Sequence, residues 1–345
     1  MANARQAANP LLTEARGRYV SAMKKRIIIL GSVLLVLVLL WSGAWLFVAN
    51  QIRSQVDALA LADGETTPQV TCGTLEIGGY PFNFDIRCSD TTLVSGDLMV
   101  TVPDVRISAL AYRPNHVLAS AQGPAQIADA FTGQRNTVSW TALDASLRIE
   151  SWRIARLSVE GDGLAWSDTL FGNALVAQSP HIEAHLLDMA EQHDAEAGRS
   201  ALAAYVMAEG VEVPGIALAQ TNAEIEGEVT GLPDDIRNWG AAPLLQDWQQ
   251  AGGKLRLIGV RASDGVSDLS ATGDLTLDAQ GFPTGSIAID SKGVAERIGP
   301  YIEEPWRTLV LGVPGEDGRH KNQLSFANGG LSSGLVPISA VPSLF

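Results

Sequence analysis

Hydrophobic and polar residues alternate along most of the chain beyond residue 68. Alternation with a period of two places apolar side chains on one face of a β-strand and polar side chains on the other. The alternating segments end at Gly, Pro, Asn, Asp or Ser, which are typical turn residues, and the chain contains 34 glycines. The clearest segments are 97–108, 136–151, 155–161, 254–263, 273–279 and 285–291. We therefore predict a mainly β fold, built as one elongated, curled antiparallel sheet.

Two stretches of this body lack the alternation. Residues 187–209 and 233–251 are rich in helix-forming residues, and the second stretch is followed by Gly252-Gly253. We predict that both are helical insertions, and that Trp239 and Trp248 anchor the second insertion to the sheet. Because the chain shows no Pro- or Ser-rich linker after residue 68, we treat residues 69–345 as one β-rich body.

One apolar segment is long enough to cross a membrane. Residues 27–49 carry no charge, and a helix of this length spans a hydrocarbon core of roughly 30 Å. A cleavable signal peptide has a shorter apolar core followed by small residues, whereas this segment ends with Trp41, Trp45 and Phe47. Tryptophans of this kind are typical of a membrane interface. We predict an uncleaved signal anchor, one transmembrane helix, followed by a short helical neck at residues 50–68.

The two sides of this segment differ in charge. Residues 1–26 contain six basic residues and one acidic residue, whereas residues 50–345 contain 18 basic and 37 acidic residues. Since basic flanks favour the cytoplasmic side, we expect a cytoplasmic basic tail at 1–26 and a periplasmic body, held in the bacterial inner membrane. The acidic body argues against a nucleic-acid partner, which requires a basic surface.

The only two cysteines, Cys72 and Cys88, flank a Gly-Gly-Tyr-Pro turn signal. In an exported domain such a pair is most simply a disulfide, and a loop of this length contributes about 3 kcal/mol through the unfolded state. A zinc site or a redox pair would favour the short Cys-x-x-Cys spacing, which is absent. The strands around the turn do not match in register, so we predict a hairpin that contains a bulge.

Tyr80, Pro81 and Phe82 are predicted to form the tip of this hairpin. The flanking disulfide gives the turn a mechanical purpose, and we favour a structural role. Contact of the exposed aromatic tip with a membrane or a partner is the alternative.

The chain carries few residue patterns typical of catalytic or metal sites. His181, Glu183 and His185 alternate with apolar residues, which indicates one solvent-facing side of a strand rather than a metal site. The chain contains no phosphate-binding loop. Acidic pairs such as Asp234-Asp235 and Glu303-Glu304 are compatible with a hydrolase. Nothing in their spacing distinguishes a catalytic pair from acidic surface residues. We expect no catalytic, cofactor-binding or metal-binding residue and no enzyme activity.

Several segments resemble one family of bacterial, mostly alphaproteobacterial, proteins: the domain of unknown function 2125. The most specific is CGTLEIGGYPFNFDIRC at 72–88, with its Gly-Tyr-Pro-Phe turn between the cysteines. The others are 244–263, 271–293 and 322–345, in the order of the family. The resemblance implies an inner-membrane-anchored, envelope-facing protein. The Gly-rich C-terminal strands are also similar, in topology and rhythm, to AsmA-type envelope proteins, which are associated with lipid handling between membranes.

The apolar sheet face is larger than two helices can cover, so it either closes on itself or leaves an open apolar groove. Our leading hypothesis is a non-catalytic protein that binds lipid or another apolar ligand in envelope maintenance. One alternative is a scaffold that binds other envelope proteins, and another is an uncharacterised periplasmic hydrolase. A groove with an open mouth favours the first, a closed core with a free strand edge the second, and a cleft of converging acids the third.

Overall fold

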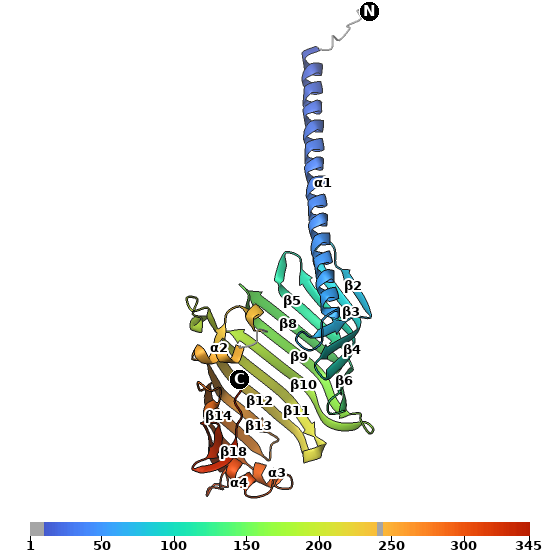
Figure 1. Cartoon of the computed structure of the whole chain (residues 1–345). Helices are drawn as coiled ribbons and strands as arrows, with labels where there is room; N and C mark the ends of the chain where they lie inside the picture. The colour runs from blue at the N-terminus through green and yellow to red at the C-terminus, as the bar shows by residue number, and fades with distance from the viewer. Residues whose placement is uncertain (1–9, 240–243) are drawn as a thin grey trace, which may run out of the picture.

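A long helix and a large antiparallel sheet make up the computed structural model, which describes residues 10–239 and 244–345 (Figure 1). Helix α1 (Pro10–Ala60) contains the apolar segment and stands away from the sheet, with its C-terminal part against the sheet edge. The predicted mainly β fold with an N-terminal apolar helix is confirmed. Residues 1–9 of the predicted basic tail and residues 240–243 of the second predicted insertion lie outside the described residues.

All strand pairings are antiparallel, and from β8 to β18 each strand pairs with the next one in the chain. They are β1 (Gln69–Thr71), β2 (Thr74–Gly78), β3 (Asn83–Ser95), β4 (Leu98–Leu110), β5 (Arg113–Gln122), β6 (Ala125–Asp129), β7 (Arg135–Ser139), β8 (Ala142–Glu150), β9 (Arg153–Asp168), β10 (Ala174–Asp188), β11 (Arg199–Val213), β12 (Leu218–Pro233), β13 (Lys254–Ser263), β14 (Asp268–Leu277), β15 (Pro283–Lys292), β16 (His320–Ala327), β17 (Gly330–Ser333) and β18 (Val336–Ala340).

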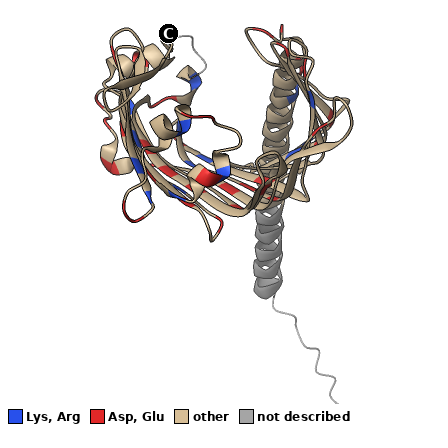
Figure 2. Ribbon diagram, turned by 90° about the horizontal axis from the view of Figure 1, so that it is seen from below, with Lys and Arg blue, Asp and Glu red and all other residues tan. Residues whose placement is uncertain are grey.

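Most pairings are simple hairpins, and short strands share an edge where a neighbour is long. Strands β1 and β2 both pair with β3, β5 and β6 both pair with β4, and β7 and β8 both pair with β9. Strands β2–β5 lie beside α1, and β14 and β18 lie farthest from it (Figure 1). Viewed from below, the sheet curls into a U, and α1 lies on the inner side of one arm (Figure 2).

The register between neighbouring strands aligns their side chains into continuous rows that run across the sheet. One row is apolar across the sheet as far as β15 and consists of Ile77, Ile86, Ile107, Ala119, Ala145, Val159, Ala184, Val206, Ile225, Val260, Ala271 and Ile289, followed by Asn322. The adjacent row on the opposite face is polar except for Met207 and consists of Glu76, Arg87, Arg106, Ser120, Asp144, Glu160, Glu183, Met207, Glu224, Arg261, Ser270, Asp290 and Lys321. We call the first side the inner face and the second the outer face.

Helices cover only parts of the inner face. At one end, Trp45 and Ala49 of α1 pack on Phe84, with Ile77 beside them. At the other end, α3 (Val294–Ile298) and α4 (Trp306–Leu311) contact β15 and β16. Between these ends, α2 (Leu244–Gln250) contacts β12 through Trp248, whereas Val206 and Ile225 on β11 and β12 stay exposed.

The first predicted helical insertion was wrong. Residues 187–209 contain the end of β10, a single 3-10 turn (Ala190–Gln192) and most of β11. Strand β11 pairs along its length with β10 on one side and β12 on the other. Two rows of sheet hydrogen bonds outweigh the helix propensity of its alanines.

The second predicted insertion is helical only in part. It contains a 3-10 turn (Ile236–Asn238) and α2 (Leu244–Gln250). Both tryptophans anchor it as predicted: the Nε1 of Trp239 donates to Pro233 O (2.9 Å) and that of Trp248 to Thr230 O (2.7 Å). A Cβ at Gly253 would lie 2.2 Å from Trp248 Nε1, so only glycine at this position lets the indole pack.

Candidate functional site

The inner face is the most extensive apolar surface of the sheet. Beside the central row run two more rows in the same register. One contains Phe84, Ala109, Val117, Leu147, Leu157, Leu186, Ala204, Gly227, Leu257, Gly273, Ile287 and Leu324. The other contains, from β8 onward, Leu143, Gly161, Ile182, Ala208, Ala223, Ala262, Leu269, Ser291 and His320. His320 is the one titratable side chain in the three rows.

The middle of this surface is open. Val206 and Ile225, opposite each other on β11 and β12, are 38% and 47% exposed. The other side chains of the central row are half-buried, although most of them are Ile, Val or Ala in the interior of a sheet. Folded monomers rarely leave a contiguous apolar surface of more than a few hundred Å² uncovered, and such surfaces mark interaction sites. The inner face of the curled sheet is therefore partly open rather than a closed core, and we call this open surface the groove.

The groove is long compared with any lipid tail. Neighbouring strands are about 4.8 Å apart, so thirteen residues in one row follow a path of roughly 55 Å. Each leaflet contributes about half of a bilayer's hydrocarbon core of roughly 30 Å. The row is thus about three to four acyl chains long.

A deeper apolar cavity lies near the far end of the groove. It has a volume of about 220 Å³ and is formed by β11–β14 together with α3. Its walls include Ala223, Ala262 and Leu269 of the inner face, covered by Val294 and Ile298. At its rim, Arg297 is paired with Asp264. The size suits the end of an apolar chain, being below the range of about 300–1,000 Å³ typical of complete small-molecule sites.

The near end of the groove is closed by aromatic packing. Trp45 of α1 stacks on Phe84 at a centroid distance of 5.4 Å and meets the edge of Tyr80 at 5.5 Å. Trp45, Ala49 and Phe84 form a buried cluster with Ile52, Ile77 and Ala111 around it. The anchor helix therefore continues directly into the first strands of the groove.

The β2–β3 hairpin, which packs on α1 at this junction between anchor helix and sheet, is closed by a disulfide. Cys72 and Cys88 form a disulfide with a Cα–Cα distance of 5.2 Å. The predicted bulge was wrong: Leu75 pairs with Cys88, Ile77 with Ile86, and Gly78 with Asp85, without a register shift. Gly79, at φ +90°, lies in the turn, where Asn83 and Asp85 leave no room for a Cβ. This glycine lets the chain turn without a register shift.

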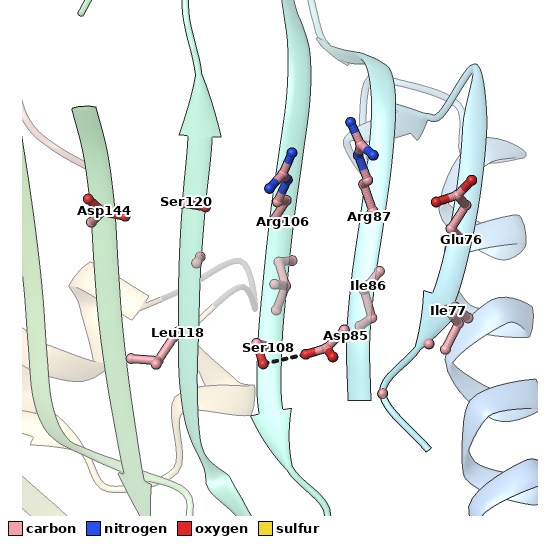
Figure 3. A pocket seen from close by; sticks show the side chains of 14 residues that line it. Glu76, Ile77, Asp85, Ile86, Arg87, Arg106, Ser108, Leu118, Ser120 and Asp144 are labelled. Carbon is pink, nitrogen blue, oxygen red and sulfur yellow. Dashed lines mark hydrogen bonds between the residues drawn. The ribbon is translucent and has the colours of Figure 1, made fainter. Parts of the chain in front are cut away.

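The outer face also has a hollow with several charged side chains (Figure 3). It has a volume of about 800 Å³ over β2–β5 and β8, and its side chains include Glu76, Arg87, Arg106 and Asp144. The two arginines already share one carboxylate, since Asp104 accepts from Arg87 Nε (2.6 Å) and Arg106 Nε (2.8 Å). The hydrogen bond from Arg87 is the largest cause that lowers the pKa of Asp104. These charges are satisfied within the sheet, and we regard the hollow as part of the solvated face.

The histidine cluster lies on the outer face, as the alternation predicted. His181 contacts Glu183 (2.9 Å) and Asp162 (2.7 Å) through its two ring nitrogens, and His185 contacts Glu183 (3.0 Å). Hydrogen bonds to Glu183 and then Asp162 raise the pKa of His181 to about 9. Hydrogen bonds from His185 and His181 lower the pKa of Glu183. The cluster forms a chain of hydrogen bonds across β9 and β10.

The acidic pairs considered for hydrolysis have separate local partners. Asp234 contacts His193 (2.8 Å), Asp235 pairs with Arg237, and Glu304 pairs with Arg307. The first pair precedes the 3-10 turn before α2 and the second precedes α4, so the two lie on different elements.

The sequence profile of one family, "Uncharacterized protein conserved in bacteria (DUF2125)", matches residues 45–342. The chain belongs to the DUF2125 family. The DUF2125 match begins at Trp45, the first α1 residue of the buried cluster, so it includes this cluster as well as the groove. A search of curated proteins found no match. The solved structures likewise gave no match, so the AsmA-type likeness stays a prediction.

Sequence reasoning missed two features of this site. The contact between the hairpin tip and α1 joins residues about forty positions apart, and no local pattern encodes it. The continuity of the apolar rows depends on the register of each strand pair, which the pattern of any one strand leaves open.

Proposed function

We propose that this DUF2125 protein is a non-catalytic lipid-binding protein of the bacterial envelope, which holds acyl chains or a similar apolar ligand along the inner face of its sheet. In this proposal, α1 anchors the protein in the inner membrane as a single-pass helix. The N-terminus is cytoplasmic and the sheet lies in the periplasm. The disulfide supports an oxidising compartment, and the basic residues before the anchor support the orientation.

The observation that carries the proposal is the uncovered stretch of the groove at Val206 and Ile225. An apolar surface that the protein leaves open is stabilised when an apolar ligand covers it. Each buried methylene contributes about 0.8 kcal/mol before the cost of immobilising the chain. A tail of about ten methylenes would therefore gain enough to bind, without any specific polar contact.

A photo-crosslinking experiment tests this at one position of the groove. A photoreactive amino acid replaces Ile225 on the inner face, and the control replaces the adjacent Glu226 on the outer face. After irradiation of intact cells, the purified protein is analysed by mass spectrometry. We expect a lipid adduct at position 225 and none at position 226. A lipid-free position 225, or equal adducts at both positions, would contradict lipid binding in the groove.

A second candidate is a scaffold that binds other envelope proteins. It is favoured by apolar side chains that project from turns at the rim farther from the membrane anchor. Phe131, Phe171, Val266 and Leu335 are all strongly exposed there. The same crosslinking experiment separates the two functions, because a protein adduct at position 225 instead of a lipid adduct would favour the scaffold.

A further inference from the structure

The tip of the β2–β3 hairpin is attached to the membrane-anchor helix by hydrogen bonds. Trp41 Nε1 donates to Pro81 O (2.9 Å), and Trp45 Nε1 donates to Asn83 O (2.9 Å). Between these two contacts, the hydroxyl of Tyr80 meets Ser42 Oγ at 2.7 Å. The hairpin thus runs back along α1, toward the helix N-terminus.

These contacts lie within the apolar part of the helix. Trp41 is eight residues before Ala49, the last residue of the uncharged segment, which places it about 12 Å along the helix inside that segment's end. Leu46 and Phe47, which lie between Trp41 and Ala49, are exposed on α1. Beside the hairpin tip, part of the helix surface is therefore apolar and not covered by protein. Such a surface is suited to contact with lipid.

The tip itself has the surface of a membrane interface. Phe82 is 64% exposed, and Tyr112, in the neighbouring β4–β5 turn, is 65% exposed. The backbone N–H of Ala111 donates to Phe82 O (2.7 Å), which joins the two turns. Aromatic side chains of this kind are enriched at the level of lipid headgroups.

The backbone of the tip is also suited to a medium of low polarity. The carbonyls of Pro81, Phe82 and Asn83 each accept a hydrogen bond, from Trp41, Ala111 and Trp45. A turn in contact with water would not need such partners, whereas backbone that enters lipid must have them.

We propose that the β2–β3 tip and the β4–β5 turn are inserted into the interfacial region of the bilayer beside α1, so that the groove begins at the membrane surface. Phe82 and Tyr112 lie among lipid headgroups and the upper acyl chains. Phe84, two residues from Phe82, then starts the inner face. The occupant of this surface is the bilayer that holds α1, and the inference does not depend on lipid binding farther along the groove.

The test measures the depth of single labelled positions in the full-length protein. Because the two native cysteines are joined in the disulfide, one new cysteine carries the only free thiol. Phe82→Cys and Tyr112→Cys are each labelled with an environment-sensitive fluorophore in vesicles of phosphatidylcholine and phosphatidylglycerol. Phe171→Cys is the matched control, since Phe171 is a 96% exposed aromatic residue in the β9–β10 turn.

We expect lipids with a nitroxide near the headgroup to quench the labels at 82 and 112, and aqueous iodide to quench them several-fold less than the label at 171. Insertion is wrong if iodide reaches all three positions equally and the lipid nitroxides quench none of them. Positions 82 and 112 lie in different turns, and neither substitution removes a backbone hydrogen-bonding group, so a folding defect in one variant leaves the other to decide.

Discussion

The covered and the open parts of the inner face show how a single sequence pattern serves two purposes. At Ile77 and Phe84, the inner face is covered by α1 and forms the buried cluster that fixes the anchor to the sheet. At Val206 and Ile225, the same face is built from the same residue types but is left open. The covered part should therefore govern stability and the open part should govern binding. Substitutions in the two parts should separate these properties.

Trp45→Ala should give the largest loss of stability. It removes the stacking on Phe84, the edge contact with Tyr80 and the hydrogen bond to Asn83 O, and replacing a large buried aromatic residue costs about 3–5 kcal/mol. Hydrogen exchange of the full chain in lipid nanodiscs should show loss of protection in β2 and β3, with unchanged protection in β11 and β12.

The control is Trp41→Phe, which loses only the hydrogen bond to Pro81 O and should cost about 1 kcal/mol. Equal loss of protection in β2–β3 and in β11–β12 would show that the junction is not a separate unit.

Removing the disulfide should have the second-largest effect. The bond closes a loop with a sequence separation of 16, for which the chain-entropy relation gives about 3 kcal/mol. A Cys72→Ala/Cys88→Ala double variant should unfold at lower denaturant concentration, and the wild type in reducing agent should match it. An unchanged midpoint would mean that α1 packing alone holds the hairpin.

Ile225→Asp should have the opposite profile: a small effect on stability and a large effect on lipid binding. Its side chain is almost half exposed, so the change should cost less than about 1 kcal/mol of stability. A carboxylate in the path of an acyl chain must be desolvated on binding, which should reduce the amount of co-purified lipid at least tenfold. The control is Glu226→Gln on the outer face of the same strand. Equal lipid content in the two variants would place the ligand elsewhere.

The contrast between these regions was only partly visible in the sequence. Alternation in segments such as 254–263 predicted strands correctly, and the uncharged segment predicted α1, because both signals are local. Strand β11 was missed since Ala203, Ala204 and Ala208 carry little contrast between its two faces. The exposure of Ile225 could not be predicted from the sequence either, because it depends on which parts of a curled sheet the helices cover.

The smallest effect concerns the outer face, where His181 lies between Glu183 and Asp162. Its pKa in the folded protein is raised to about 9, so the charged form is favoured by folding. The stability from this interaction is fully present below the ordinary histidine pKa of about 6.5 and is lost as the pH rises through about 9. The difference in unfolding free energy between wild type and His181→Gln should therefore shrink over this range.

Lipid occupancy should stay constant over the same pH range, because the open part of the groove carries no group that titrates there. NMR titration of the His181 ring gives the direct readout, and Glu183→Gln should bring its pKa back toward the ordinary value. A lipid content that follows the titration of His181 would show that the two faces are coupled through the sheet. The outer face, which contributes to stability, and the open part of the inner face, which binds, would then not be independent.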